Sequence, residues 1–155
     1  MLTKITIKLT SAFLGSAKQN VDGIRKLIYV NNKPKLFIHR FNLLCNKYAQ
    51  ELKIGNFDNE HIKVTSYLET NAPVRIEKRK FYKGYKEKEE KFESYSEGAL
   101  LSFNCYIDES MIPLENAIKI IECIGKYDGI SQFGFKWNYG RFEIELVEPI
   151  TANYV

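Results

Sequence analysis

Two apolar stripes at helical spacing, separated and flanked by alternating segments, constrain this fold most strongly. The first stripe consists of Phe41, Leu44, Cys45, Tyr48, Ala49 and Leu52. The second follows Pro113, which suits the first turn of a helix, and consists of Leu114, Ala117, Ile118, Ile121 and Ile124. We predict a helix from each stripe, the first ending at Gly55 and the second at Gly125 and Gly129.

Period-two alternation predicts the strands around these helices. Near the N-terminus, Ile5, Ile7 and Leu9 alternate with polar residues, as in a strand with one buried face. Similar patterns predict strands over 61–68, 100–107 and 141–147. The order strand, helix, strand, strand, helix, strand is the split βαβ, or ferredoxin-like, arrangement. We therefore predict a single α+β domain over residues 1–155, an antiparallel sheet with two helices on one face.

Two segments interrupt this pattern. The turn signal Asn31-Asn32-Lys33-Pro34 between the apolar runs 27–30 and 36–38 predicts an inserted hairpin. Residues 70–98 are the most charged and least regular part of the chain, and we expect a charged loop or a solvated hairpin there. Residues 21–30 fit a short helix or an extended segment equally well.

The net charge, the length of the apolar runs and the number of cysteines limit the functional classes to which this protein can belong. The net charge of +4 is too small by itself to indicate nucleic-acid binding, so its distribution matters more. No apolar run approaches the roughly 20 residues of a membrane span, and the N-terminus lacks the features of a signal peptide. We therefore expect a cytoplasmic protein. Cys45, Cys105 and Cys123 are scattered and odd in number, which indicates buried free thiols rather than disulfides or a zinc site.

The glycine- and aromatic-rich segment 129–142 (GISQFGFKWNYGRF) is the first candidate binding site. Glycines permit positive φ angles, so backbone amides can face a phosphate, while cations add charge and aromatic rings can stack on unpaired bases. The candidate residues here are Gly134, Lys136, Trp137, Tyr139, Gly140 and Arg141. The alternative is a tight structural turn whose aromatic residues cover the core.

A second candidate is the basic and aromatic segment 75–85, from which we expect contacts by Arg75, Arg79, Lys80 and Tyr82. Lysines and arginines interleaved with aromatic residues are typical of surfaces that follow a phosphate backbone and stack bases. Glutamates from Glu77 to Glu93 offset part of this charge, which would equally suit a solvated hairpin.

The run G-I-x-Q-F-G-F-x-x-N-Y-G-R-F between a helix and the last strand resembles the C-terminal glycine-rich loop of the repeat-associated mysterious protein (RAMP) superfamily. Its members are ferredoxin-like RNA-binding subunits and processing endonucleases of CRISPR systems. The chain also resembles uncharacterised phage and prophage proteins that end in a G-x-G-Q-[WF]-R-x-x-x-Y-G-R-F-like motif. Residues 72–75 and 97–103 resemble the G-P-R and G-x-x-x-x-F portions of that group, while residues 34–40 lack the glycines and serines of the RAMP I-P-G-S-S-x-K-G segment.

Three hypotheses follow. The first is a non-catalytic RAMP-like protein, encoded by a phage or prophage, that binds single-stranded RNA or DNA or a nucleoprotein complex. The second is a protein-interaction module that mimics or inhibits a subunit of a host defence complex of the CRISPR type. The third is a metal-independent endoribonuclease, because several RAMP endonucleases use a histidine near the first helix and His39 lies there. We predict no cofactor and no metal site, and the sequence leaves a homo-oligomer open.

Overall fold

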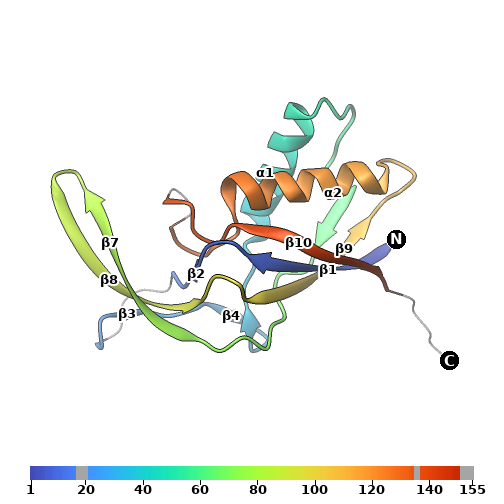
Figure 1. Ribbon diagram of the computed structural model, residues 1–155. Helices are drawn as coiled ribbons and strands as arrows, with labels where there is room; N and C mark the ends of the chain where they lie inside the picture. The colour runs from blue at the N-terminus through green and yellow to red at the C-terminus, as the bar shows by residue number, and fades with distance from the viewer. Residues whose placement is uncertain (17–20, 135–136, 151–155) are drawn as a thin grey trace.

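The computed structural model describes residues 1–16, 21–134 and 137–150, which form an α+β fold (Figure 1). Its central sheet has four antiparallel strands in the order β10-β1-β9-β6. The strands are β1 (Leu2–Leu9), β6 (Ile62–Val64), β9 (Leu100–Ile107) and β10 (Phe142–Pro149). Helix α1 (Ile38–Glu51) connects β1 to β6 through the inserted segments, and α2 (Leu114–Cys123) connects β9 to β10. The predicted ferredoxin-like arrangement is confirmed.

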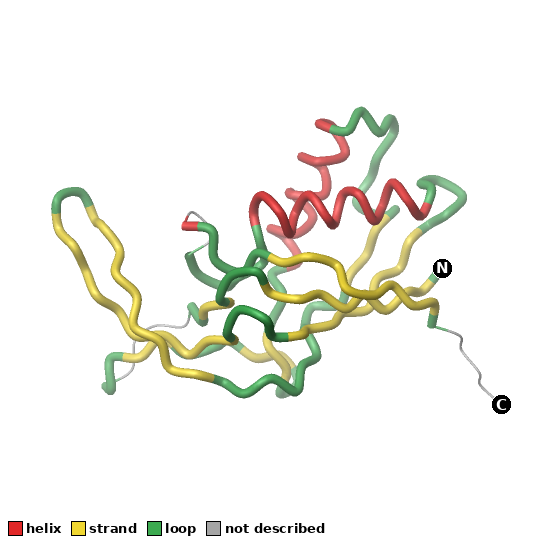
Figure 2. The backbone as a smooth tube through the Cα atoms, viewed as in Figure 1, coloured by secondary structure: helices red, strands yellow, loops and turns green. Residues whose placement is uncertain are grey.

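Both helices cover the same face of the central sheet, as Figure 2 shows. The side chains of Ile5, Ile7 and Leu9 point into this layer and are fully buried. The alternate residues Lys4, Thr6 and Lys8 lie on the opposite face and are partly exposed. Because side chains alternate along a strand, that opposite face is polar.

Helix α2 ends at Cys123, just before the first of the two glycines expected to end it. The chain continues through a π-helical turn, η1 (Ile124–Asp128), and ends at Gly129, whose φ angle is 80°. Gly125 is instead a packing residue, because a Cβ there would lie 2.7 Å from the ring carbon Cδ1 of Phe142. Its lack of a side chain lets η1 approach β10 closely.

A second sheet contains β2 (Phe13–Leu14), β3 (Ile24–Arg25), β7 (Arg75–Lys83) and β8 (Lys86–Tyr95). Of the two alternatives for residues 70–98, a charged loop or a solvated hairpin, the structure has largely a long β-hairpin, which Figure 1 shows projecting from the body of the molecule. The sequence pattern did not give the bounds of its strands, because both faces carry charged residues. Without one apolar face, a strand gives no alternation of hydrophobicity.

The predicted inserted hairpin is present but shorter than expected. It consists of β4 (Tyr29–Val30) and β5 (Lys33–Pro34), joined by Asn31 and Asn32 with φ angles of 51° and 62°. The expected second arm over 36–38 instead leads directly into α1. The predicted strand 61–68 is also shorter, because after β6 the chain turns away to bond with the β5 region, where the Leu68 amide donates to the Pro34 carbonyl at 2.8 Å.

The three cysteines are free, with Cys45 and Cys105 buried and Cys123 partly buried. Burial raises the pKa of each thiol, that of Cys105 to about 12. Within the described ranges, no helix has both the length and the apolar character needed to cross a bilayer.

Candidate nucleic-acid interface

The register of the β7–β8 hairpin divides its residues between two faces. Cross-strand partners share a face, and Arg79 is paired with Glu90, whereas Lys78 is paired with Lys91. Residues 75, 77, 79 and 81 therefore face one side, which we call the inner face because Phe81 is buried there. Residues 76, 78, 80 and 82 form the outer face. The four residues expected to act together, Arg75, Arg79, Lys80 and Tyr82, are thus split two and two.

The inner face packs against the glycine-rich segment through a small apolar cluster, separate from the main core. Its buried members are Ala12, Leu14, Phe81 and Phe92, and Phe133 and Tyr139 pack against it. The ring of Phe81 lies 4.8 Å from that of Trp137 and 5.5 Å from that of Phe133, centroid to centroid. Phe133, Trp137 and Tyr139 therefore anchor the hairpin through ring contacts with Phe81. Trp137 still keeps 46% of its surface exposed.

Several backbone amides of the glycine-rich segment are engaged within the protein. The amide of Gly140 donates to the Ala12 carbonyl at 2.7 Å, and that of Ile130 donates to the Gly140 carbonyl at 2.9 Å. The amides of Trp137 and Tyr139 both donate to the carbonyl of Gly134. The amides of Ile130, Trp137, Tyr139 and Gly140 are therefore satisfied within the protein and are not free to bind a phosphate.

The cations expected in this segment are also partly engaged. One guanidinium nitrogen (Nη2) of Arg141 donates to the Tyr127 carbonyl at 3.2 Å and to Asn138 Oδ1 at 2.5 Å. Lys136 lies outside the described residues. On the inner face, Arg79 forms an ion pair with Glu77 and lies over the Tyr139 ring at 5.4 Å. Arg79 therefore links the hairpin to the glycine-rich segment, and the carboxylate of Glu77 compensates much of its charge.

The outer face is where the hairpin presents free cations. Lys78 and Lys91 are exposed and directly opposite each other, and neither forms an ion pair with a described residue. Lys80 does have a carboxylate partner, Glu87, at 3.6 Å. Tyr82 lies on the same face with 67% of its surface exposed. Like charges directly opposite each other destabilise a sheet, so an anion between the two lysines would relieve a strain present in the free protein.

Lys91 is the residue that the sequence reasoning missed. Its partner is fixed by the turn at Gly84 and Tyr85, because Lys83 pairs with Lys86 and the ladder continues in step to Lys78 and Lys91. The sequence signal that could have revealed this turn is Gly84, which stands between two charged runs. In the structure its φ angle is 63°. A hairpin built on that turn would have placed Lys91 beside the predicted segment.

The two histidines lie in different surroundings. His39 lies exposed in the first turn of α1, and no described residue forms a hydrogen bond or ion pair with it. His61 is buried, where its Nδ1 accepts from the Asp58 amide at 3.1 Å and its ring packs against Phe57. Across the described part of the chain, no group of three or more His, Cys, Asp or Glu residues could hold a metal ion.

No protein-family model matches this chain, and no curated protein matches it. Solved structures do. A chain in the cryo-EM structure of the type III-B Cmr-beta bound to cognate target RNA aligns with a TM-score of 0.64 and 11% identity, over 95% of this chain and 59% of that one. A chain of a type IV-B CRISPR complex aligns with a TM-score of 0.54 and 10% identity, over 100% of this chain and 92% of that one.

These likenesses concern the fold. The chain spans less than two thirds of the matching Cmr-beta chain and nearly all of the type IV-B chain. The α+β arrangement is thus shared with chains of CRISPR assemblies, as the resemblance to the RAMP superfamily implied.

Proposed function

We propose that this protein binds single-stranded RNA or DNA without catalysing a reaction, as a RAMP-like component of a nucleoprotein complex. The observation that carries the proposal is the charge of the hairpin tip, residues 78–91. This segment holds seven lysines and arginines against three glutamates, an excess equal to the net charge of +4 of the whole chain. The rest of the chain is balanced, so the projecting hairpin carries the electrostatic attraction for a polyanion.

The outer face supplies the contacts. Lys78 and Lys91 would bind phosphate, and the exposed ring of Tyr82 beside them would stack on an unpaired base. Trp137 offers a second exposed ring at the margin of the inner face. Stacking on open aromatic faces favours single strands, because bases in a duplex are covered by their neighbours.

A salt titration tests this proposal. A short fluorescein-labelled single strand should bind the wild type at low salt, and the double variant Lys78→Ala/Lys91→Ala should reduce the slope of log K against log salt by about 1.4, roughly 0.7 for each phosphate that is no longer neutralised. Lys119→Ala, an exposed lysine on α2, is the matched control and should leave the slope unchanged. The double variant Lys136→Ala/Arg141→Ala measures the share of the glycine-rich segment. Absence of binding at low salt, or an unchanged slope in Lys78→Ala/Lys91→Ala, would overturn the proposal.

A second candidate function is a protein-interaction module within, or directed against, a CRISPR-type complex. It is favoured by β10, which pairs with β1 along one edge and with no other described strand, and which exposes Leu146. An open edge of this length can accept a strand from a partner. Pull-down from a host lysate with and without nuclease separates the two functions: a partner retained after nuclease, with no strand binding by the purified protein, favours this one.

A further inference from the structure

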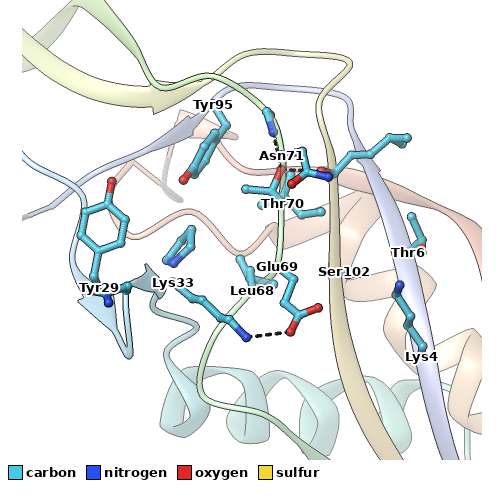
Figure 3. A pocket seen from close by; sticks show the side chains of 15 residues that line it. Lys4, Thr6, Tyr29, Lys33, Leu68, Glu69, Thr70, Asn71, Tyr95 and Ser102 are labelled. Carbon is cyan, nitrogen blue, oxygen red and sulfur yellow. Dashed lines mark hydrogen bonds and ion pairs between the residues drawn. The ribbon is translucent and has the colours of Figure 1, made fainter. Parts of the chain in front are cut away.

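A cavity of about 690 Å³ lies on the polar face of the central sheet, opposite the helices (Figure 3). Lys4 and Thr6 of β1 and Ser102 of β9 line one side of it. Tyr29 and Lys33, from the β4–β5 hairpin, line the other. The segment 68–72 runs between the two sides. The volume falls within the range of roughly 300–1,000 Å³ that is usual for small-ligand sites.

The β1 side of the cavity presents donors that have no partner among the described residues. Thr6 and Ser102 are opposite each other in the β1–β9 ladder, and neither hydroxyl hydrogen-bonds within the described part of the chain. Lys4, two residues before Thr6 on the same face, forms no ion pair with a described residue. An ammonium group and two hydroxyls on adjacent strands are suited to the oxygens of a phosphate.

The opposite side supplies an aromatic surface. Tyr29 is 45% exposed, and Figure 3 shows its hydroxyl end directed toward that of Tyr95, which is buried. Burial is the main cause that raises the pKa of both phenols, so both remain neutral hydrogen-bond donors at physiological pH. A tyrosine ring at the mouth of a polar cavity can stack on a base.

Glu69 determines how strongly the cavity attracts an anion. Its carboxylate accepts from Lys33 Nζ at 2.8 Å, and this hydrogen bond, followed by the charge of Lys33 and, more weakly, that of Lys4, lowers the pKa of Glu69. The carboxylate is therefore charged at neutral pH and offsets Lys33. Lys4 is left as the cation that a ligand can neutralise.

We propose that this cavity binds one nucleoside monophosphate, with the phosphate held by Lys4, Thr6 and Ser102 and the base against Tyr29. The site is separate from the outer face of the hairpin, so it can exist whether or not the hairpin binds a strand. The monophosphate unit can be a free nucleotide or a nucleotide of a strand, since the contacts are the same.

Isothermal titration of the full chain with each of the four ribonucleoside 5′-monophosphates tests the proposal. At least one should bind, about tenfold more tightly than its nucleoside or inorganic phosphate. Lys4→Met, which keeps the length of the side chain, should weaken binding about tenfold. Glu69→Gln should strengthen it by about threefold, because it removes the competing negative charge and frees Lys33. A gain in affinity cannot result from misfolding. Absence of mononucleotide binding, equal binding of inorganic phosphate, or a weaker Glu69→Gln variant would overturn the proposal.

The hairpin variant Lys78→Ala/Lys91→Ala provides the control, because it should leave mononucleotide affinity unchanged even where strand binding is lost. Loss of mononucleotide binding in this variant would contradict a separate site. Competition then identifies the natural source of the ligand. Displacement of the mononucleotide by a single strand indicates a nucleotide within a strand, and failure of the strand to displace it indicates a free nucleotide.

Discussion

Gly140 holds the chain at the point where the glycine-rich segment meets β2 and β10. Its φ angle is 73°, and a Cβ there would lie 2.6 Å from the Cα of Ser131. The sequence correctly indicated that Gly140 needs the backbone freedom of a glycine. It could not indicate whether a bound ligand or a neighbouring segment of the protein requires that freedom. A phosphate cradle and a close backbone crossing both require the absence of a Cβ, and only the hydrogen bond from the Gly140 amide to Ala12 distinguishes them.

Replacement of Gly140 by alanine should therefore destabilise the fold by about 2–4 kcal/mol, since the unfavourable φ angle and a steric clash add. Gly98→Ala is a matched control, because Gly98 has a φ angle of 91° but a Cβ there would meet nothing within 4 Å. That variant should lose only about 1 kcal/mol. Urea unfolding followed by far-ultraviolet circular dichroism measures both. Equal losses would show that the backbone crossing contributes nothing.

At the level of elements, the β7–β8 hairpin is the part that sequence reasoning described least well. The two helices and β1 were predictable because one apolar face repeats along each. The hairpin has no such face along its length, since its inner face places Glu77 and Arg79 beside Phe81. Its charge was visible in the sequence, but the division between an anchored and an exposed face depends on register.

The register predicts a repulsive coupling between Lys78 and Lys91. In a double-mutant cycle with Lys78→Glu and Lys91→Glu, each single variant places opposite charges face to face, and the double variant restores like charges. The cycle should return a coupling of about 0.2–1 kcal/mol, measured by amide hydrogen exchange of β7 and β8. Each single variant should also weaken strand binding. A cycle between Lys78→Glu and Lys119→Glu on α2 should give no coupling, and a similar value there would contradict the assigned register.

At the scale of the whole molecule, the buried apolar residues form two separate clusters of very different size. The larger joins the central sheet to the helices, and the smaller joins the hairpin to the glycine-rich segment through Phe81 and Phe92. The larger cluster follows from periodicity within single segments. The smaller one joins segments about 50 residues apart, Phe81 and Phe133, by ring contacts that no local pattern indicates. This is why the fold was predictable while the arrangement of the candidate sites was not.

The division predicts that the hairpin can be released without unfolding the core. Phe81→Ala removes a ring that contacts Phe92, Phe133, Trp137 and Tyr139, a change that typically costs about 3–5 kcal/mol when the ring is fully packed. Because the small cluster shares no buried residue with the main core, most of this loss should appear locally. Fluorescence of Trp137, the only tryptophan, should then change at lower urea than the helical signal, and exchange should rise in β7 and β8 but not in β1. Tyr82→Ala, on the outer face of the same strand, should leave both signals coincident. A single shared transition in Phe81→Ala would show instead that the two clusters unfold as one unit.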